Sequence, residues 1–182
     1  MMNTFVGFLR GINVGGRNIL PMKELRALLE ELGLEKVKSY IQSGNVVFQS
    51  AMGDTDSLSQ EVRTTIKERY GFAPQVLFLH HEELQIAVAS NPFPDGESEP
   101  KTIHLFFMAS AAGSPDMAKL ESLRRESERF KLVGQVFYLH APDGIGRSKL
   151  AANIENSLGV PVTARNWRTV SKINSMAADL AV

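Results

Sequence analysis

Apolar residues in the first half of the chain switch between short runs and helical spacing. Residues 4–9 form a run rich in strand formers that stops at a glycine-rich loop, residues 11–16. Pro21 then opens a helix that Gly33 can cap. The apolar positions of that helix recur at helical spacing, at Met22, Leu25, Leu28, Leu29 and Leu32.

The rest of the first half continues with a hairpin pattern and two more helices. Strands at 37–41 and 46–49 flank a turn-like segment, residues 42–45. Asp56 or Ser57 can cap a helix that ends at Gly71. A strand at 75–79 and a helix at 81–90 follow. The predicted order is therefore β-α-β-β-α-β-α.

The second half repeats this order of elements. Residues 91–101 contain three prolines, a glycine and three acids, which is typical of a linker. Beyond them, strands are predicted at 102–108, 131–133, 135–140 and 160–163, and helices at 116–128, 149–158 and 167–180. No residue-level identity links the halves, so the repeat rests on element order alone.

The order β-α-β-β-α-β is typical of the split-βαβ, ferredoxin-like unit. We therefore expect an α+β fold of two tandem ferredoxin-like units, with antiparallel sheets, helices on one face and an extra helix after each unit. The expected division is a first unit at 1–91, a linker at 92–101 and a second unit at 102–182. One continuous sheet shared by both halves is the alternative.

Composition excludes several function classes. Hydrophobic residues make up 43% of the 182 residues, as in an ordinary globular protein. The absence of cysteine removes disulfides, thiol catalysis and thiolate zinc sites. No run reaches the roughly 18 apolar residues of a membrane span, and the N-terminus does not resemble a signal peptide. We expect a cytoplasmic protein without a membrane partner.

Charge is balanced overall but segregated locally. Lys+Arg and Asp+Glu both number 20, yet three basic loops contain no acid: residues 10–18, 144–149 and 165–168. Arginine suits phosphate or carboxylate recognition, glycine-rich backbone can donate N–H groups, and Trp167 could stack on a base. If the halves mirror each other, these loops could converge at one cleft. We therefore expect binding of an anionic ligand such as a nucleotide or a nucleic acid segment.

The candidate ligand-binding residues come from these loops and from the polar turn after residue 40. They are Arg10, Gly11, Asn13, Gly15, Gly16, Arg17, Gln42, Ser43, Asn45, Arg147, Lys149, Arg165, Asn166, Trp167 and Arg168. Each group also has a structural interpretation. The glycines can serve turns that need positive φ, residues 42–45 can form a hairpin in which polar side chains satisfy the backbone, and a lone tryptophan is often part of a core.

Familiar catalytic motifs are absent. Arg17-Asn18 stand where a phosphate-binding loop needs Lys and Ser/Thr, and the glycine spacing does not fit a dinucleotide fingerprint. The four histidines lack helical ligand spacing, so neither a metal nor a cofactor is expected. Two alternatives stay open. One is an enzyme acting on a small phosphorylated or carboxylated metabolite, with Ser43 or Tyr40 near the reacting atom. The other is a scaffold or oligomer whose loops are structural.

Four sequence motifs, in this order, carry a resemblance. They are Leu9–Gly16 followed by Met22–Arg26, then Tyr40–Val46, Gly146–Leu150 and Thr163–Trp167. Together they resemble the bacterial family called domain of unknown function 1697, over essentially the whole chain. The resemblance implies a repeated α+β fold in a bacterial cytosolic protein. It implies no established activity and no catalytic residue.

Overall fold

The computed structural model describes residues 1–181, whose contacts divide the chain into two compact units. The first unit comprises Met1–Ile86 together with Lys172–Val182, and the second comprises Ala87–Ser171. This division differs from the expected one in three places. The first part of the first unit ends at Ile86 instead of residue 91. The last helix is shared between the units, and the stretch expected as a linker belongs to the second unit and contains a short 3-10 helix, η1 (Pro94–Ser98).

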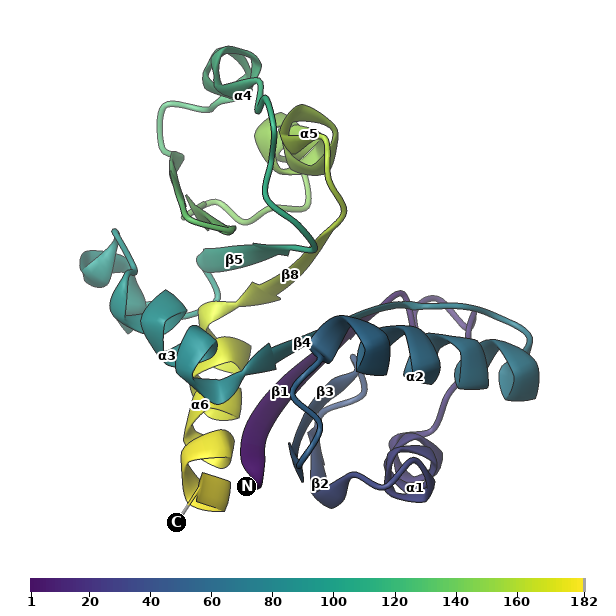
Figure 1. Cartoon of the computed structure of the whole chain (residues 1–182). Coiled ribbons are helices and arrows are strands. Elements are labelled where there is room, and N and C mark those ends of the chain that lie inside the picture. Colours follow the sequence, from purple (N-terminus) through teal and green to yellow (C-terminus); the bar gives the residue numbers. More distant parts are fainter. Residues whose placement is uncertain (182) are drawn as a thin grey trace. The chain divides into compact units, whose positions relative to one another are not determined.

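The first unit is built on a four-stranded antiparallel sheet of order β2-β3-β1-β4 (Figure 1). Its strand β1 pairs with both β3 and β4, and β2 pairs with β3. The elements in chain order are β1 (Asn3–Arg10), α1 (Met22–Glu31), β2 (Glu35–Tyr40), β3 (Asn45–Ser50), α2 (Thr55–Tyr70), β4 (Gln75–His80) and α3 (His81–Ala89).

The helices α1 and α2 cover one face of this sheet (Figure 1). The apolar stripe of α1 and the stripe of α2 form one core with alternate residues of the strands, including Phe5, Leu9 and Phe48. Phe5 and Phe48 stack with their ring centroids 5.4 Å apart. Burial of aromatic and aliphatic side chains at these positions is the main force that holds the unit together.

The second unit repeats the topology, with sheet order β6-β7-β5-β8. Its elements are β5 (Ile103–Met108), α4 (Met117–Leu123), β6 (Arg129–Val133), β7 (Val136–His140), α5 (Lys149–Leu158), β8 (Val162–Asn166) and the start of α6 (Trp167–Ala181). Helices α4 and α5 pack on the face that presents Phe106, Phe137 and Leu139. Both units therefore have the expected α+β, ferredoxin-like arrangement, and the single shared sheet is excluded.

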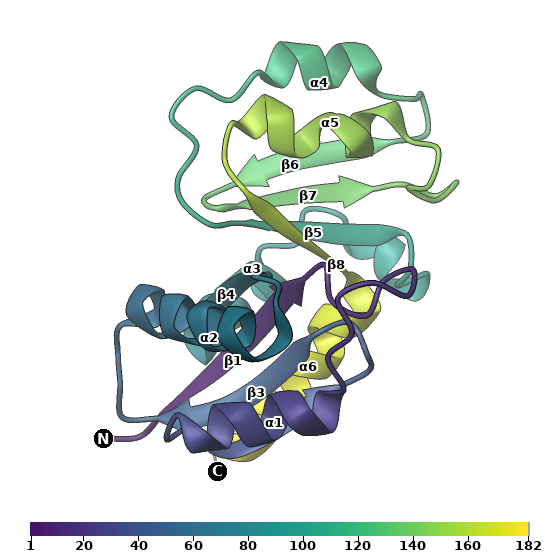
Figure 2. The same ribbon diagram turned by 90° about the vertical axis from the view of Figure 1, so that its right-hand side faces the viewer.

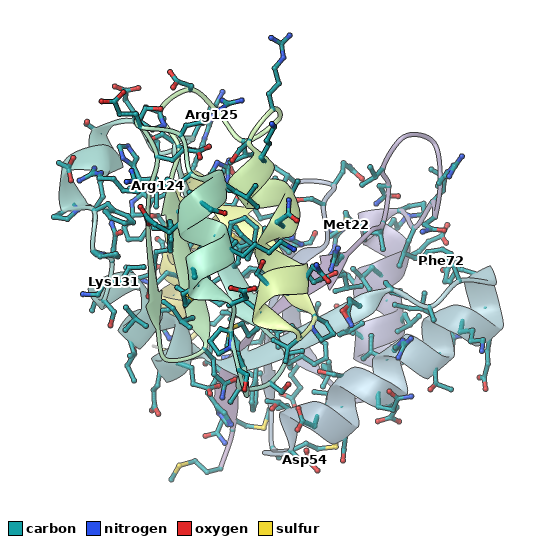
Figure 3. All side chains as sticks on the ribbon, turned by 90° about the horizontal axis from the view of Figure 1, so that it is seen from above. Met22, Asp54, Phe72, Arg124, Arg125 and Lys131 are labelled. Atoms are coloured by element: carbon teal, nitrogen blue, oxygen red, sulfur yellow. The ribbon has the colours of Figure 1, made fainter. Side chains whose placement is uncertain are left out.

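Most element boundaries lie within two residues of the sequence predictions, and three differences have a local cause. The helix expected to run to residue 128 ends at Leu123, because the carboxylate of Glu128 accepts the Arg125 N–H at 2.9 Å and closes a turn in its place. The strand expected at 160–163 lies at 162–166, since Pro161 has no N–H to donate to a neighbouring strand. The cap of α2 is Asp54, which accepts the N–H groups of the residues two and three positions on and lies at the start of that helix (Figure 3).

Among residues 1–181, none of the helices combines the length and the apolar composition that a bilayer span requires.

Candidate anion-binding site

Two of the candidate segments leave the first sheet where strands β1 and β2 end. This end of the sheet forms one edge of the first unit. Strands β1 and β2 are both antiparallel to β3, so they run parallel to each other and end at one edge, at Arg10 and Tyr40. The loop 11–21 follows β1, and the turn 41–44 follows β2. Figure 2 shows the β1–α1 connection at this edge of the first unit.

Asn13 ties the loop to the turn. Its Nδ2 donates to the carbonyl oxygens of Leu20 at 2.8 Å and Gln42 at 2.9 Å, while its Oδ1 accepts the Leu20 N–H at 2.8 Å. Asn13 has a φ of 54°, a left-handed conformation that asparagine tolerates better than most residues. One carboxamide therefore fixes backbone that lies up to 29 residues apart in sequence.

The glycines at the tip of this loop form a tight turn. The Arg17 N–H donates to the Val14 carbonyl at 3.0 Å, and Gly15 and Gly16 between them have φ angles of 57° and 72°. Two positive φ values in a two-residue loop are characteristic of the hairpin turn that matches strand twist. The N–H groups of Gly15 and Gly16 make no hydrogen bond within residues 1–181. Both glycines thus serve the turn and still present donors at its tip.

The turn 41–44 supports the structural interpretation given for it. Gly44 has a φ of 83°, and its carbonyl accepts the Leu9 N–H at 2.8 Å. The fully buried Asn45 donates through Nδ2 to the Tyr40 carbonyl at 3.1 Å and to Ser43 Oγ at 2.9 Å. Ser43 and Asn45 therefore hold the hairpin. The side chain of Gln42 is exposed.

Cationic side chains surround this edge, and no acid occurs in residues 10–18 or 40–45. Arg10 and Arg17 are exposed, and the Arg17 guanidinium makes no ion pair or hydrogen bond within residues 1–181. Arg26 on α1 reaches the same end of β2, where its Nη1 donates to Ser39 Oγ at 2.5 Å. Glu24, the acid in the first turn of α1, accepts a hydrogen bond from the Tyr70 hydroxyl. This hydrogen bond raises the pKa of Tyr70.

Four residues of this edge were not among the sequence candidates. Arg26 lies off the apolar stripe of α1, so only the β2–α1 packing reveals it. The other three are large apolar side chains that are exposed: Val14 (63%), Ile19 (55%) and Ile41 (52%). Their signal in the sequence is three β-branched apolar residues within segments otherwise rich in glycine and polar residues.

The basic loop of the second unit precedes α5. Ser148 caps that helix, accepting the Ala151 N–H through Oγ at 3.0 Å, and both Arg147 and Lys149 beside it are exposed. The guanidinium of Arg125, which follows α4 (Figure 3), donates to the Arg147 carbonyl. An acid, Asp143, directly precedes this loop. Its carboxylate accepts a hydrogen bond from the Ser127 hydroxyl at 2.6 Å. The surroundings of this loop are less uniformly cationic than those of the loop 10–18.

The residues expected at 165–168 are mostly engaged in the fold. Arg165 is largely withdrawn from solvent on β8, and this burial lowers its pKa to about 10. Asn166 Oδ1 accepts the Thr169 N–H at 3.0 Å at the start of α6. Trp167 is only 7% exposed, so its ring lies in the interior, and the expected stacking on a base has no exposed face to use. Arg168 is exposed and shares a cavity of about 340 Å³ with the acid Glu99.

The repeated topology allows the positions of the two basic loops to be compared. The loop 11–21 connects the first strand of its unit to the first helix. The loop 141–148 connects the third strand of the second unit to its second helix, which corresponds to residues 51–54 of the first unit. The two basic loops therefore occupy non-equivalent positions in the repeated fold. Nine of the candidates, from Arg10 to Asn45, belong to the first unit and flank the ends of β1 and β2, and the other six belong to the second unit.

Neither a metal cluster nor a catalytic constellation marks the site. Residues 1–181 contain no group of three His, Cys, Asp or Glu side chains placed to hold a metal ion. The hydroxyl of Ser43 accepts a hydrogen bond from Asn45, and no base lies among residues 10–18 and 40–45 to activate it. The arrangement has the chemistry of an anion-binding surface.

Comparisons with known proteins are consistent with this fold. The family model described as "Protein of unknown function (DUF1697)" matches residues 2–138. A solved structure, that of the conserved bacterial protein SP0830 from Streptococcus pneumoniae, is 30% identical and has a TM-score of 0.67. The similarity covers 97% of this chain and 99% of that one. Comparison with curated proteins gives no match.

Proposed function

Because the chain belongs to the DUF1697 family of proteins of unknown function, its own residues must carry the functional argument, and we propose that it binds a phosphate-bearing ligand at the first-unit edge. We define the first-unit edge as residues 10–19 and 40–45. The observation that carries the proposal is an exposed arginine, Arg17, on a loop fixed by Asn13 and free of acids. Because the loop backbone is already fixed, it loses little conformational entropy when an anion binds.

The groups at this edge match the needs of a phosphate. Arg17 can donate two parallel N–H bonds to phosphate oxygens, and the N–H groups of Gly15 and Gly16 point from positive-φ backbone at the same tip. Arg10 and Arg26 add positive charge at the ends of β1 and β2. In a chain with no net charge, this local excess of cations favours an anion here over the rest of the surface.

The test uses a simple phosphate polymer and oligonucleotides as probes. Binding of fluorescent inorganic polyphosphate and of labelled oligonucleotides is measured for the unaltered protein, for Arg17→Gln and for Arg63→Gln. Arg63 is an exposed arginine on α2, away from the edge, and serves as the matched control. Loss of a charge-assisted contact predicts about tenfold weaker binding for Arg17→Gln and no change for Arg63→Gln. Equal affinity in both variants, or no binding of any probe, would overturn the proposal.

A further inference from the structure

Exposed aliphatic side chains accompany the cations of the first-unit edge. Val14, Ile19 and Ile41 expose 63%, 55% and 52% of their surface. Each is adjacent in sequence to a residue of the Asn13 hydrogen bonds. Val14 follows Asn13, while Ile19 and Ile41 precede the two residues whose carbonyls Asn13 contacts, Leu20 and Gln42. The Asn13 hydrogen bonds therefore join the backbone segments that carry these three β-branched residues.

Ile41 also adopts a backbone conformation that its side chain disfavours. Its φ is 49°, in the left-handed region, where a β-branched residue is a genuine outlier. Glycine or asparagine would take this conformation with little strain. The side chain is half exposed, so its packing within the fold does not account for an isoleucine here. Strain that folding does not require is a recognised mark of a functional site.

From these observations we infer that the first-unit edge is a nucleic-acid interface, in which Val14, Ile19 and Ile41 contact sugars and bases while the arginines hold phosphates. This inference rests on the proposed function and names its ligand class. A free phosphate or polyphosphate offers no apolar surface, whereas a nucleotide strand alternates charge with apolar sugar faces, base edges and thymine methyl groups. A two-residue hairpin such as 14–17 is also narrow enough to enter a groove.

The charge pattern favours nucleic acid over an acidic protein surface. Arg10 ends β1 and Arg17 lies seven residues further on in the loop that follows, and residues 10–18 include no acid that could pair with a basic side chain of a protein partner. Protein interfaces have an apolar centre that is depleted in charged residues, whereas nucleic-acid interfaces are much more positively charged. The first-unit edge has the second pattern.

The decisive variant is Ile41→Asn, because it separates binding from stability. Asparagine relieves the strain at positive φ, so the midpoint of thermal unfolding should rise by about 2–4 °C. Removal of the apolar contact should weaken binding of a labelled oligonucleotide about three- to tenfold. Binding of inorganic polyphosphate should not change. A residue with a merely structural role would not combine higher stability with weaker binding of one probe alone.

Single-stranded and double-stranded oligonucleotides of equal length are titrated separately, so that the preferred form is identified. Val14→Ser provides a second variant at the edge, and Ile86→Asn is the matched control, since Ile86 is 66% exposed on α3. We expect Val14→Ser to act as Ile41→Asn does on oligonucleotides, and Ile86→Asn to leave their binding unchanged.

Three results would overturn this inference. One is oligonucleotide binding that Ile41→Asn and Val14→Ser leave unchanged while Arg17→Gln weakens it, which would leave the proposed phosphate site standing. A second is a polyglutamate peptide of matched charge that binds as tightly as the oligonucleotides and is equally sensitive to Ile41→Asn. The third is binding of no phosphate-bearing probe at all, in which case the proposed function fails as well.

Discussion

Single residues with unusual backbone conformations organise the first-unit edge. Asn13 and Asn18 have φ angles of 54° and 51°, and each donates through its side chain to a backbone carbonyl across the loop. Asparagine combines tolerance of this conformation with a carboxamide that can replace backbone hydrogen bonds. These two residues thus stabilise a loop that has few apolar side chains inside it.

Replacement of Asn13 by alanine should loosen this edge. The change removes three hydrogen bonds and leaves alanine at a positive φ, so the free energy of unfolding should fall by about 2 kcal/mol. Urea denaturation measures the loss, and hydrogen exchange should show faster exchange of the Leu20 N–H. The control is Asn153→Ala, which removes one exposed bond within α5 and should cost less than about 0.5 kcal/mol. Unchanged Leu20 exchange would contradict the role given to Asn13.

Two histidines with lowered pKa values should make the second unit sensitive to mild acid. Burial lowers the pKa of His104, and burial together with the Arg129 charge lowers the pKa of His140. Because both take up a proton more readily when unfolded, their contribution is fully present above about pH 6.5 and is lost as the pH falls through their folded values. Urea midpoints measured from pH 7.5 to pH 5 should therefore decline.

The variant His104→Gln isolates one of these groups. Glutamine does not titrate, so the decline in the urea midpoint between pH 7.5 and pH 5 should be shallower than in the unaltered protein. The range stops at pH 5 because the lowered pKa of Asp95, held down by its hydrogen bond to Arg129, gives a separate loss at lower pH. Identical pH profiles for the two proteins would show that His104 does not contribute.

At the scale of elements, the two hairpins β2–β3 and β6–β7 have equivalent positions but differ in how their turns are packed. Gly44 is buried, and a Cβ there would lie 2.8 Å from Leu9 Cβ and 3.0 Å from the Leu9 carbonyl oxygen. Gly134 has a φ of 57°, but a Cβ there would meet nothing within 4 Å. The first turn is therefore constrained by its neighbours as well as by φ, and the second by φ alone.

This difference predicts unequal effects of the same substitution. Gly134→Ala should cost about 1 kcal/mol, the ordinary penalty for alanine at positive φ. Gly44→Ala adds a clash with backbone and Leu9 and should cost about 3 kcal/mol or more, with loss of the Asn13-linked edge. Chemical denaturation of the two variants makes the comparison. Equal costs would mean that the contact between Gly44 and Leu9 does not constrain the turn.

The elements were largely predictable from the sequence, while the contacts between segments were not. Apolar periodicity and turn residues identify every strand and α-helix of both units, but not the 3-10 helix η1, because these signals are local. The end of α4 depends on the Glu128 carboxylate, which accepts a hydrogen bond from the Arg125 N–H. In the sequence, Glu128 looks like one more polar residue on the surface of the helix. The bond from Asn13 to Gln42 spans 29 residues, and the burial of Trp167 depends on tertiary packing, so neither has a local signature.

At the scale of the whole molecule, the last helix belongs to both units. Residues 172–182 group with the first unit, although they follow the second in sequence. Two contacts illustrate this: Gln49 Nε2 donates to the Leu180 carbonyl at 2.8 Å, and His81 Nε2 lies 3.0 Å from Asn174 Oδ1. The first unit is thus completed by the end of α6.

Truncation before residue 172 should therefore affect the first unit more than the second. We expect faster hydrogen exchange in β3 and at the start of α3, which lose the partners of Gln49 and His81, and little change in β7. Hydrogen-exchange mass spectrometry of the truncated and full chains makes this comparison. Loss of protection confined to residues 87–171 would contradict the division of the chain into these units.

The central claim, that phosphate binds at the first-unit edge, is tested most directly by the salt dependence of oligonucleotide affinity. Each phosphate contact by a cation adds about 0.7 to 0.9 to the slope of log K against log salt. For Arg17→Gln we predict weaker binding and a slope shallower by about one contact, with both unchanged in Arg63→Gln. A slope near zero for the unaltered protein, or the same slope for all three proteins, would contradict the claim.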